Sequence, residues 1–140
     1  KKKARFLRGL FSGGTFVSEA QVILPALIGE VKSNAPLDKK LKLVDSLRLS
    51  GHAVIDLGED EFTVGRPHPM IDYTLRNKMI VAEAAKPDVA VLLLDVVLGY
   101  GSNLKPLDDD NIVFSDLVLF PSSLNYSIHY FTSLSRIICE

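Results

Sequence analysis

The residues best suited to chemistry near the amino end of the chain are Ser12, Gly13, Gly14 and Thr15. They follow a short apolar run over residues 5–11 and precede residues with helical spacing. Glycines between a strand and a helix let backbone N–H groups converge on an anion at the positive end of the helix dipole. Neither GxGxxG nor a complete P-loop motif is present, so a plain capped turn is the alternative to a phosphate-binding turn.

A second polar segment runs from Asp56 to Asp72 with the sequence DLGEDEFTVGRPHPMID. Pro67 and Pro69 fix the backbone on both sides of His68 and donate no backbone hydrogen bonds. Beside Arg66, a histidine held in this way can act as an acid or base, or bind a phosphoryl group electrostatically. Arg66 and His68 are therefore the candidate catalytic residues, and a rigid surface turn whose histidine caps a helix is the alternative.

Five further residues are candidates for supporting roles around this site: Asp56, Asp60, Asp95, Gly99 and Gly101. The acidic residues could hold Mg²⁺ through one or two carboxylates and several waters, but such a charge run is more often solvated, and we expect no metal site. The two glycines can bring the backbone close to a ligand or simply form a turn. His52 and His129 have no metal-ligand spacing with another histidine.

Alternating strand and helix patterns must position these residues. Apolar runs predict strands over residues 5–11, 53–57, 89–94 and 112–120. Helical spacing predicts a helix from Phe16 to Val31, interrupted at Pro25, and another that Asp72 caps, with an apolar stripe of Ile71, Leu75, Met79 and Ala82. The alternation predicts an α/β fold with a parallel sheet, in which the first strand lies between the second and third. The turns after these three strands should then meet at one edge, where ligands bind in such sheets.

Composition narrows the classes of protein. A chain of 140 residues with 47% hydrophobic and 24% charged residues is a single globular domain. Its net charge of −1 predicts no nucleic-acid or membrane partner. The single cysteine, Cys139, excludes an internal disulfide, and no apolar run reaches the length of a membrane span, so we expect a cytoplasmic location.

Three segments resemble the FdrA family, relatives of the alpha subunit of succinyl-CoA synthetase. They are RGLFSGGTFVSE at residues 8–19, the segment DLGEDEFTVGRPHPMID, and LLDVVLGYG at residues 93–101, in the same order and at a matching spacing. The resemblance implies a flavodoxin-like three-layer CoA-ligase domain. It stops after Ser102, so the single domain over 1–140 is expected to have a divergent or truncated C-terminal part over 103–140.

The resemblance also implies a function. In succinyl-CoA synthetase the turn matching Ser12 to Thr15 stabilises the phosphate of a phosphohistidine. That histidine does not carry over, because Gly51-His52-Ala53 precedes the second strand and matches the family motif only in letters, and the partner glutamate falls near Val96. We therefore expect a phosphate-handling domain of an acyl-CoA synthetase-like protein, inactive alone.

The resemblance implies partners as well. A small-molecule anion would bind directly, and CoA or a nucleotide would bind through an N-terminal CoA-binding-like domain and partner subunits. Two alternatives stay open. One is a subunit domain of an oxamate carbamoyltransferase in purine (allantoin) catabolism, and the other is a non-catalytic module for anion binding or subunit docking.

Overall fold

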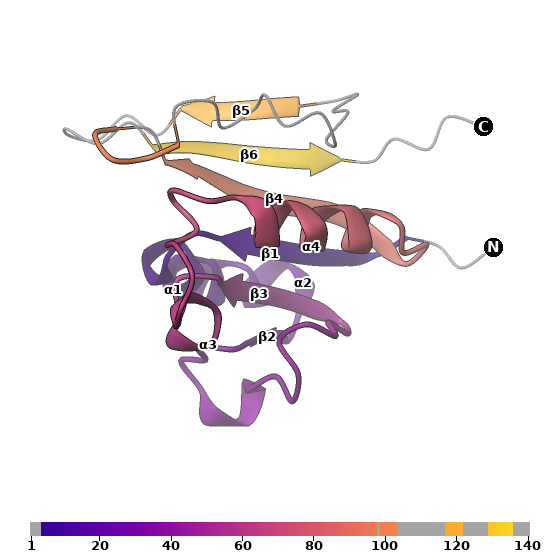
Figure 1. The fold of residues 1–140 in the computed structure, drawn as a ribbon. Coiled ribbons are helices and arrows are strands. Elements are labelled where there is room, and N and C mark those ends of the chain that lie inside the picture. The colour runs from indigo at the N-terminus through magenta and orange to yellow at the C-terminus, as the bar shows by residue number, and fades with distance from the viewer. Residues whose placement is uncertain (1–3, 98, 104–116, 122–128, 136–140) are drawn as a thin grey trace.

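The chain forms one mixed sheet with helices on both faces (Figure 1). The computed structural model describes residues 4–97, 99–103, 117–121 and 129–135. In chain order the elements are β1 (Phe6–Phe11), α1 (Gly14–Ile23), α2 (Pro25–Ile28), β2 (Val31–Ser33), the 3₁₀ helix η1 (Lys39–Leu41), β3 (His52–Asp56), α3 (Asp60–Thr63), α4 (Thr74–Ala84), β4 (Val89–Val97), β5 (Leu117–Pro121) and β6 (His129–Ser135).

The parallel part of the sheet confirms the predicted strand order. The whole order is β2-β3-β1-β4-β6-β5, and β1 pairs in parallel with both β3 and β4. The strand β2 extends this parallel part beyond β3. Beyond β4 the direction changes, because β6 pairs antiparallel with β4 and β5 pairs antiparallel with β6. The four parallel strands with their helices form an α/β, flavodoxin-like arrangement.

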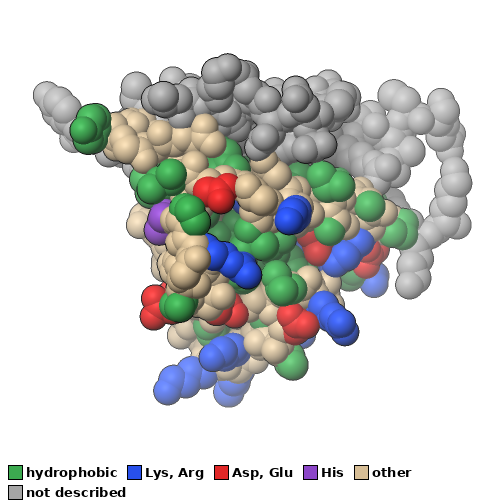
Figure 2. All heavy atoms as spheres, in the orientation of Figure 1, with side chains coloured by type: hydrophobic (Ala, Val, Ile, Leu, Met, Phe, Trp, Pro, Cys, Tyr) green, Lys and Arg blue, Asp and Glu red, His purple; other side chains and the backbone are tan. Residues whose placement is uncertain are grey.

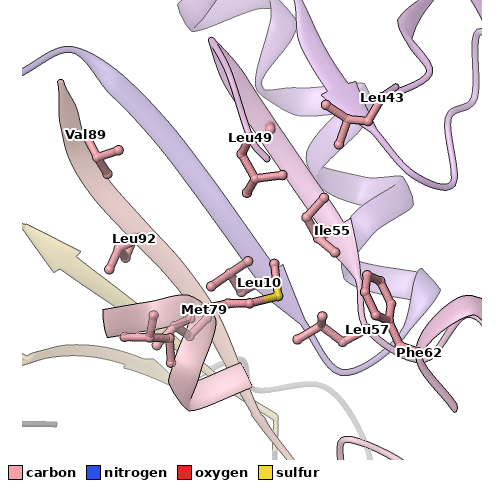
Figure 3. Packing of buried hydrophobic residues seen from close by; sticks show 12 residues of the cluster. Leu10, Leu43, Leu49, Ile55, Leu57, Phe62, Met79, Val89 and Leu92 are labelled. Carbon is pink, nitrogen blue, oxygen red and sulfur yellow. The ribbon is translucent and has the colours of Figure 1, made fainter. Parts of the chain in front are cut away.

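Alternate residues of the central strands pack into separate cores on the two faces of the sheet. On the α4 face, Leu10, Ile55 and Leu92 pack with Met79 and Ile80 of the helix (Figure 3). On the α1 face, the intervening residues of the same strands pack with the helix, and this smaller cluster contains Phe11, Val17, Ala20, Val31, Val54 and Leu93. Burial of both faces explains why the third predicted strand is apolar without alternation.

The local predictions agree with the structure at Pro25 and differ from it elsewhere. The break at Pro25 is confirmed, since α1 ends before it and α2 begins with it. Val31, however, begins β2 instead of ending a helix, and the connection after β3 contains the short helix α3. The helix α4 buries a face different from the one predicted. Ile71 precedes α4 and is exposed, Ala82 is exposed within it, and the buried residues are Arg76, Met79, Ile80 and Glu83.

The C-terminal part is described only in two strands. Of the strand predicted over 112–120, residues 117–120 lie in β5, and residues 112–116 lie outside the described residues. No element was predicted where β6 forms, because its sequence HYFTSLS has no usable period. Cys139 also lies outside the described residues. Within the described residues, no helix is long and apolar enough to cross a membrane.

Candidate functional site

The turns that follow β1, β3 and β4 meet at one edge of the sheet, as predicted. The backbone N–H of Ser12 donates to Asp95 Oδ1 at 2.8 Å, and the Ser12 hydroxyl donates to the same oxygen at 3.1 Å. The carboxylate of Asp56 lies against the next residues of the turn, because a Cβ atom on Gly14 would lie 2.9 Å from Asp56 Oδ2. The parallel strands therefore bring two aspartates to the first turn.

Asp56 is held at the end of β3 by its neighbours. Asn34, just after β2, donates to the Asp56 carbonyl oxygen at 2.8 Å and accepts from the Asp56 N–H at 2.9 Å. The N–H of Gly58 donates to Asp56 Oδ1 at 2.8 Å. Burial raises the pKa of Asp56 above its ordinary value, and the Gly58 hydrogen bond and nearby His68 only partly oppose this. The carboxylate thus has nearby donors and a reduced tendency to ionise.

His68 lies beside the same turn. A Cβ atom on Gly58 would lie 3.0 Å from the Ser12 carbonyl oxygen and 3.2 Å from His68 Nε2, so both groups lie close to Gly58. The backbone N–H of Met70 donates to His68 Nδ1 at 3.2 Å. A backbone N–H can only donate, so the neutral imidazole carries its proton on Nε2. His68 therefore presents an N–H donor near the Ser12 turn.

The amino terminus of α1 completes this group of residues. No side chain caps the helix and its first turn contains no acidic residue. Gly14 and Thr15 are exposed to solvent, and the first N–H groups of a helix have no acceptor within it. A small anion placed here would meet backbone donors and the positive end of the helix dipole, and the His68 Nε2–H lies near the preceding Ser12 carbonyl oxygen. We call Ser12–Thr15, Asp56 and His68 the carboxyl-edge cluster.

Arg76 of α4 anchors this cluster and was not predicted. Its Nη1 donates to the Asp95 carbonyl oxygen at 2.8 Å and to the Ser12 hydroxyl at 3.1 Å, and lies 3.3 Å from Asp95 Oδ1. Its guanidinium also lies 3.8 Å from the ring centre of Tyr73. Burial raises the pKa of Asp95, while Arg76 and the two Ser12 donors oppose the rise. The first and third turns and α4 are thus joined by one buried polar network.

Comparison with known proteins gives the family. The CoA-ligase family matches residues 10–109, which include all three turns and α4. The chain belongs to the CoA-ligase family. It is 43% identical over 103 residues to the uncharacterized protein YahF of Escherichia coli strain K12. This match covers 74% of the chain but 20% of YahF, so the CoA-ligase domain described here spans about a fifth of that relative's length.

Three other predicted site residues of the CoA-ligase domain, Gly99, Gly101 and Asp60, lie outside the carboxyl-edge cluster. Gly99 and Gly101 adopt positive φ angles of 154° and 84°, in a turn whose Asn103 donates to the Met70 carbonyl oxygen at 2.9 Å. This turn therefore packs on the loop that holds His68. Asp60 begins α3 and is exposed, with no side-chain contact to the cluster among the described residues.

Arg66 is separated from His68 although only Pro67 lies between them. Arg66 is exposed and lines a cavity together with residues of α4, and the lining includes neither His68 nor any residue of the Ser12 turn. The prolines thus place the two side chains in different surroundings. Of the predicted catalytic pair, the described contacts bring only His68 to the carboxyl-edge cluster.

His52 lies at the start of β3, and therefore at the opposite edge of the parallel sheet from the cluster. Its Nδ1 accepts a hydrogen bond from the N–H of Leu7 at 3.1 Å, and burial with the nearby Arg8 and Arg5 lowers its pKa. This location agrees with the expectation that Gly51-His52-Ala53 matches the family motif only in letters. Within the part of the chain that the structure describes, no three His, Cys, Asp or Glu residues are grouped as metal ligands would be.

Proposed function

We propose that this CoA-ligase domain handles phosphate at the Ser12–Thr15 turn, as part of an FdrA-like acyl-CoA synthetase protein. The observation that carries the proposal is the uncapped, exposed start of α1 beside the Nε2–H of His68. Backbone amides, helix dipole and imidazole donor are all complementary to phosphoryl oxygens.

The proposed role of His68 is electrostatic. A nucleophilic Nε2 would need its lone pair, and the Met70 N–H bound to Nδ1 instead favours the tautomer with the proton on Nε2. His68 then donates to a phosphoryl oxygen and stabilises charge that develops there. This role needs no phosphohistidine on the domain itself.

The rest of the reaction is assigned to other parts of the protein. The proposal assigns the binding of CoA or a nucleotide to an N-terminal CoA-binding-like domain and to partner subunits, and the match to about a fifth of YahF is compatible with such further domains. In the intact protein, His68→Ala should lower turnover at least tenfold, as expected for loss of a charge-stabilising donor. Unchanged turnover would favour a non-catalytic binding module.

A titration with inorganic phosphate tests the site directly. Gly13 has an extended backbone (φ −169°), and a Cβ atom there would meet nothing within 4 Å, so Gly13→Val keeps the fold while its side chain obstructs the turn. Phosphate should shift the amide signals of Gly14 and Thr15 in the unchanged chain and not in this variant. Ser18→Val, exposed one turn later on α1, is the matched control and should bind as the unchanged chain does. Equal phosphate affinity in all three proteins would contradict the proposed site.

A further inference from the structure

A second cavity lies between the loop after β3 and the first turns of α4. Its volume is about 350 Å³, within the range of small-molecule sites. Its lining comes from β3's end, α3, the proline-rich loop and α4, and contains Leu57, Phe62, Arg66, Pro67, Pro69, Asp72, Thr74, Leu75, Arg76 and Lys78. None of the residues of the carboxyl-edge cluster lines it, although Arg76, which anchors that cluster through Ser12, does.

The apolar part of the lining is substantial. Leu57 and Phe62 belong to the buried core on the α4 face, and Leu75 packs against that core while remaining partly accessible. Figure 2 shows hydrophobic side chains gathered on this face, with basic and acidic side chains around them. An apolar body of a ligand can therefore cover core side chains here.

The charged part of the lining favours an anion. Among the described lining residues, Arg66, Arg76 and Lys78 are cationic and Asp72 alone is acidic. The Asp72 carboxylate already accepts from the Thr74 N–H at 2.9 Å and from the Thr74 hydroxyl at 2.6 Å. Among the described residues, neither Arg66 nor Lys78 makes a salt bridge or a side-chain hydrogen bond.

Arg76 adds a buried donor to the cavity wall. Its residue is 3% exposed, and its Nε has no hydrogen-bond acceptor within the described part of the chain. The Arg76 guanidinium therefore contributes positive charge to the cavity lining from a buried position.

From these observations we infer that the cavity binds a small amphipathic carboxylate, with its apolar body on Leu57, Phe62 and Leu75 and its carboxylate facing the cationic side chains. The cations select the carboxylate and the apolar lining selects against a bare inorganic anion. This inference does not rest on the phosphate proposal, because none of the residues of the carboxyl-edge cluster lines the cavity.

The test compares three probes by amide chemical shifts: hexanoate, 1-hexanol and inorganic phosphate. Hexanoate should shift the signals of Phe62, Leu75 and Lys78, and should bind at least fivefold more tightly than 1-hexanol. Equal affinity for the acid and the alcohol would overturn the anionic part of the inference. If phosphate shifts the same three signals as strongly as hexanoate, the apolar body of the ligand is not needed and that part of the inference is wrong. If hexanoate shifts none of them, the cavity does not bind an amphipathic carboxylate and the whole inference is wrong.

Substitutions of the cationic side chains test the same inference about carboxylate binding. Both Arg66 and Lys78 are exposed, so Arg66→Gln and Lys78→Gln should leave the fold intact. Each should weaken hexanoate binding about two- to fivefold, as for an exposed ion pair, and leave 1-hexanol binding unchanged. Lys39→Gln in η1 removes the same charge at a residue that does not line the cavity and should have no effect. If the Lys39 variant weakens hexanoate binding as much as the other two, general charge attraction explains the binding and the inference is wrong.

Discussion

In the part of the chain that the structure describes, two buried ion pairs join α4 to the sheet, one at each edge, and they differ in what surrounds them. At the amino edge, Arg8 of β1 donates to Glu83 at 3.0 Å, and Lys86 shares the same carboxylate. At the carboxyl edge, Arg76 pairs with Asp95 and also binds Ser12. Both arginines are at most 3% exposed, so the chemistry of the pairs is similar.

Only the carboxyl-edge pair adjoins a helix N-terminus that is open to solvent. Asp95 holds the Ser12 N–H, and the uncapped start of α1 follows within two residues. At the amino edge Arg8 instead donates to the Leu49 carbonyl oxygen at 3.4 Å, and the network includes no helix N-terminus. The two pairs differ because the Arg76–Asp95 pair lies at the carboxyl ends of the parallel strands, where ligands bind in such sheets, and the Arg8–Glu83 pair does not.

The largest effect is expected from breaking the amino-edge pair. Glu83→Gln leaves Arg8 without a counter-charge in a buried position, which should lower the free energy of unfolding by about 3 kcal/mol. Urea unfolding measures this loss, and phosphate binding to the folded fraction should stay unchanged. Glu30→Gln, an exposed change of the same kind, should shift the free energy by less than about 0.5 kcal/mol. A Glu83 variant as stable as this control would show that the pair is unimportant.

A smaller loss of stability is expected at the carboxyl edge. The pKa of Asp95 is raised, so the fold already tolerates its neutral form, and Asp95→Asn should cost only about 1–2 kcal/mol. The asparagine oxygen can still accept from Ser12, but Arg76 loses its ion pair and holds the turn less firmly. Phosphate affinity should therefore fall about three- to tenfold. A larger stability loss than that of Glu83→Gln would reverse the comparison.

The smallest change in stability is expected from Asp56→Asn. Because burial raises the pKa of Asp56 above 3.8, the folded chain binds this proton more tightly than the unfolded chain. The contribution of Asp56 to the free energy of unfolding therefore decreases as pH rises from 3.8 through the raised pKa. The variant should lose this part of the pH dependence in urea unfolding, while the part from Asp95 remains.

Asp56→Asn should also strengthen phosphate binding about two- to fivefold, since it removes a negative charge beside Gly14. If the pH dependence of the free energy of unfolding is unaltered and phosphate binds more weakly, the Asp56 carboxylate stabilises the ligand site and this prediction is wrong. Asp60→Asn, at an exposed position of α3, is the matched control and should change neither quantity.

The sequence was sufficient to predict the parallel core and the meeting of its turns. Apolar strands and the Ser-Gly-Gly-Thr turn are local patterns, and chain direction then determines which ends meet. The break at Pro25 is equally local, because the ring cannot continue the helix.

The long-range partners could not be predicted in the same way. Arg76 binds Ser12 across 64 residues and Asn34 binds Asp56 across 22, and no periodicity encodes such pairs. One signal was present in the sequence, because the buried residues of α4 have the spacing of a single helix face: Arg76, Met79, Ile80 and Glu83. Two of them are charged, so a search for apolar residues alone does not find this face. The strand β2 and the helix α3 are too short to produce a recognisable period.

A phosphate titration of three proteins followed by amide chemical shifts tests the central claim most directly. The account predicts saturable shifts at Gly13, Gly14 and Thr15 in the unchanged chain, the same affinity in Glu83→Gln at a temperature where it is folded, and clearly weaker binding in Asp95→Asn. Absence of shifts at the turn in the unchanged chain, or equal weakening in both variants, would contradict it.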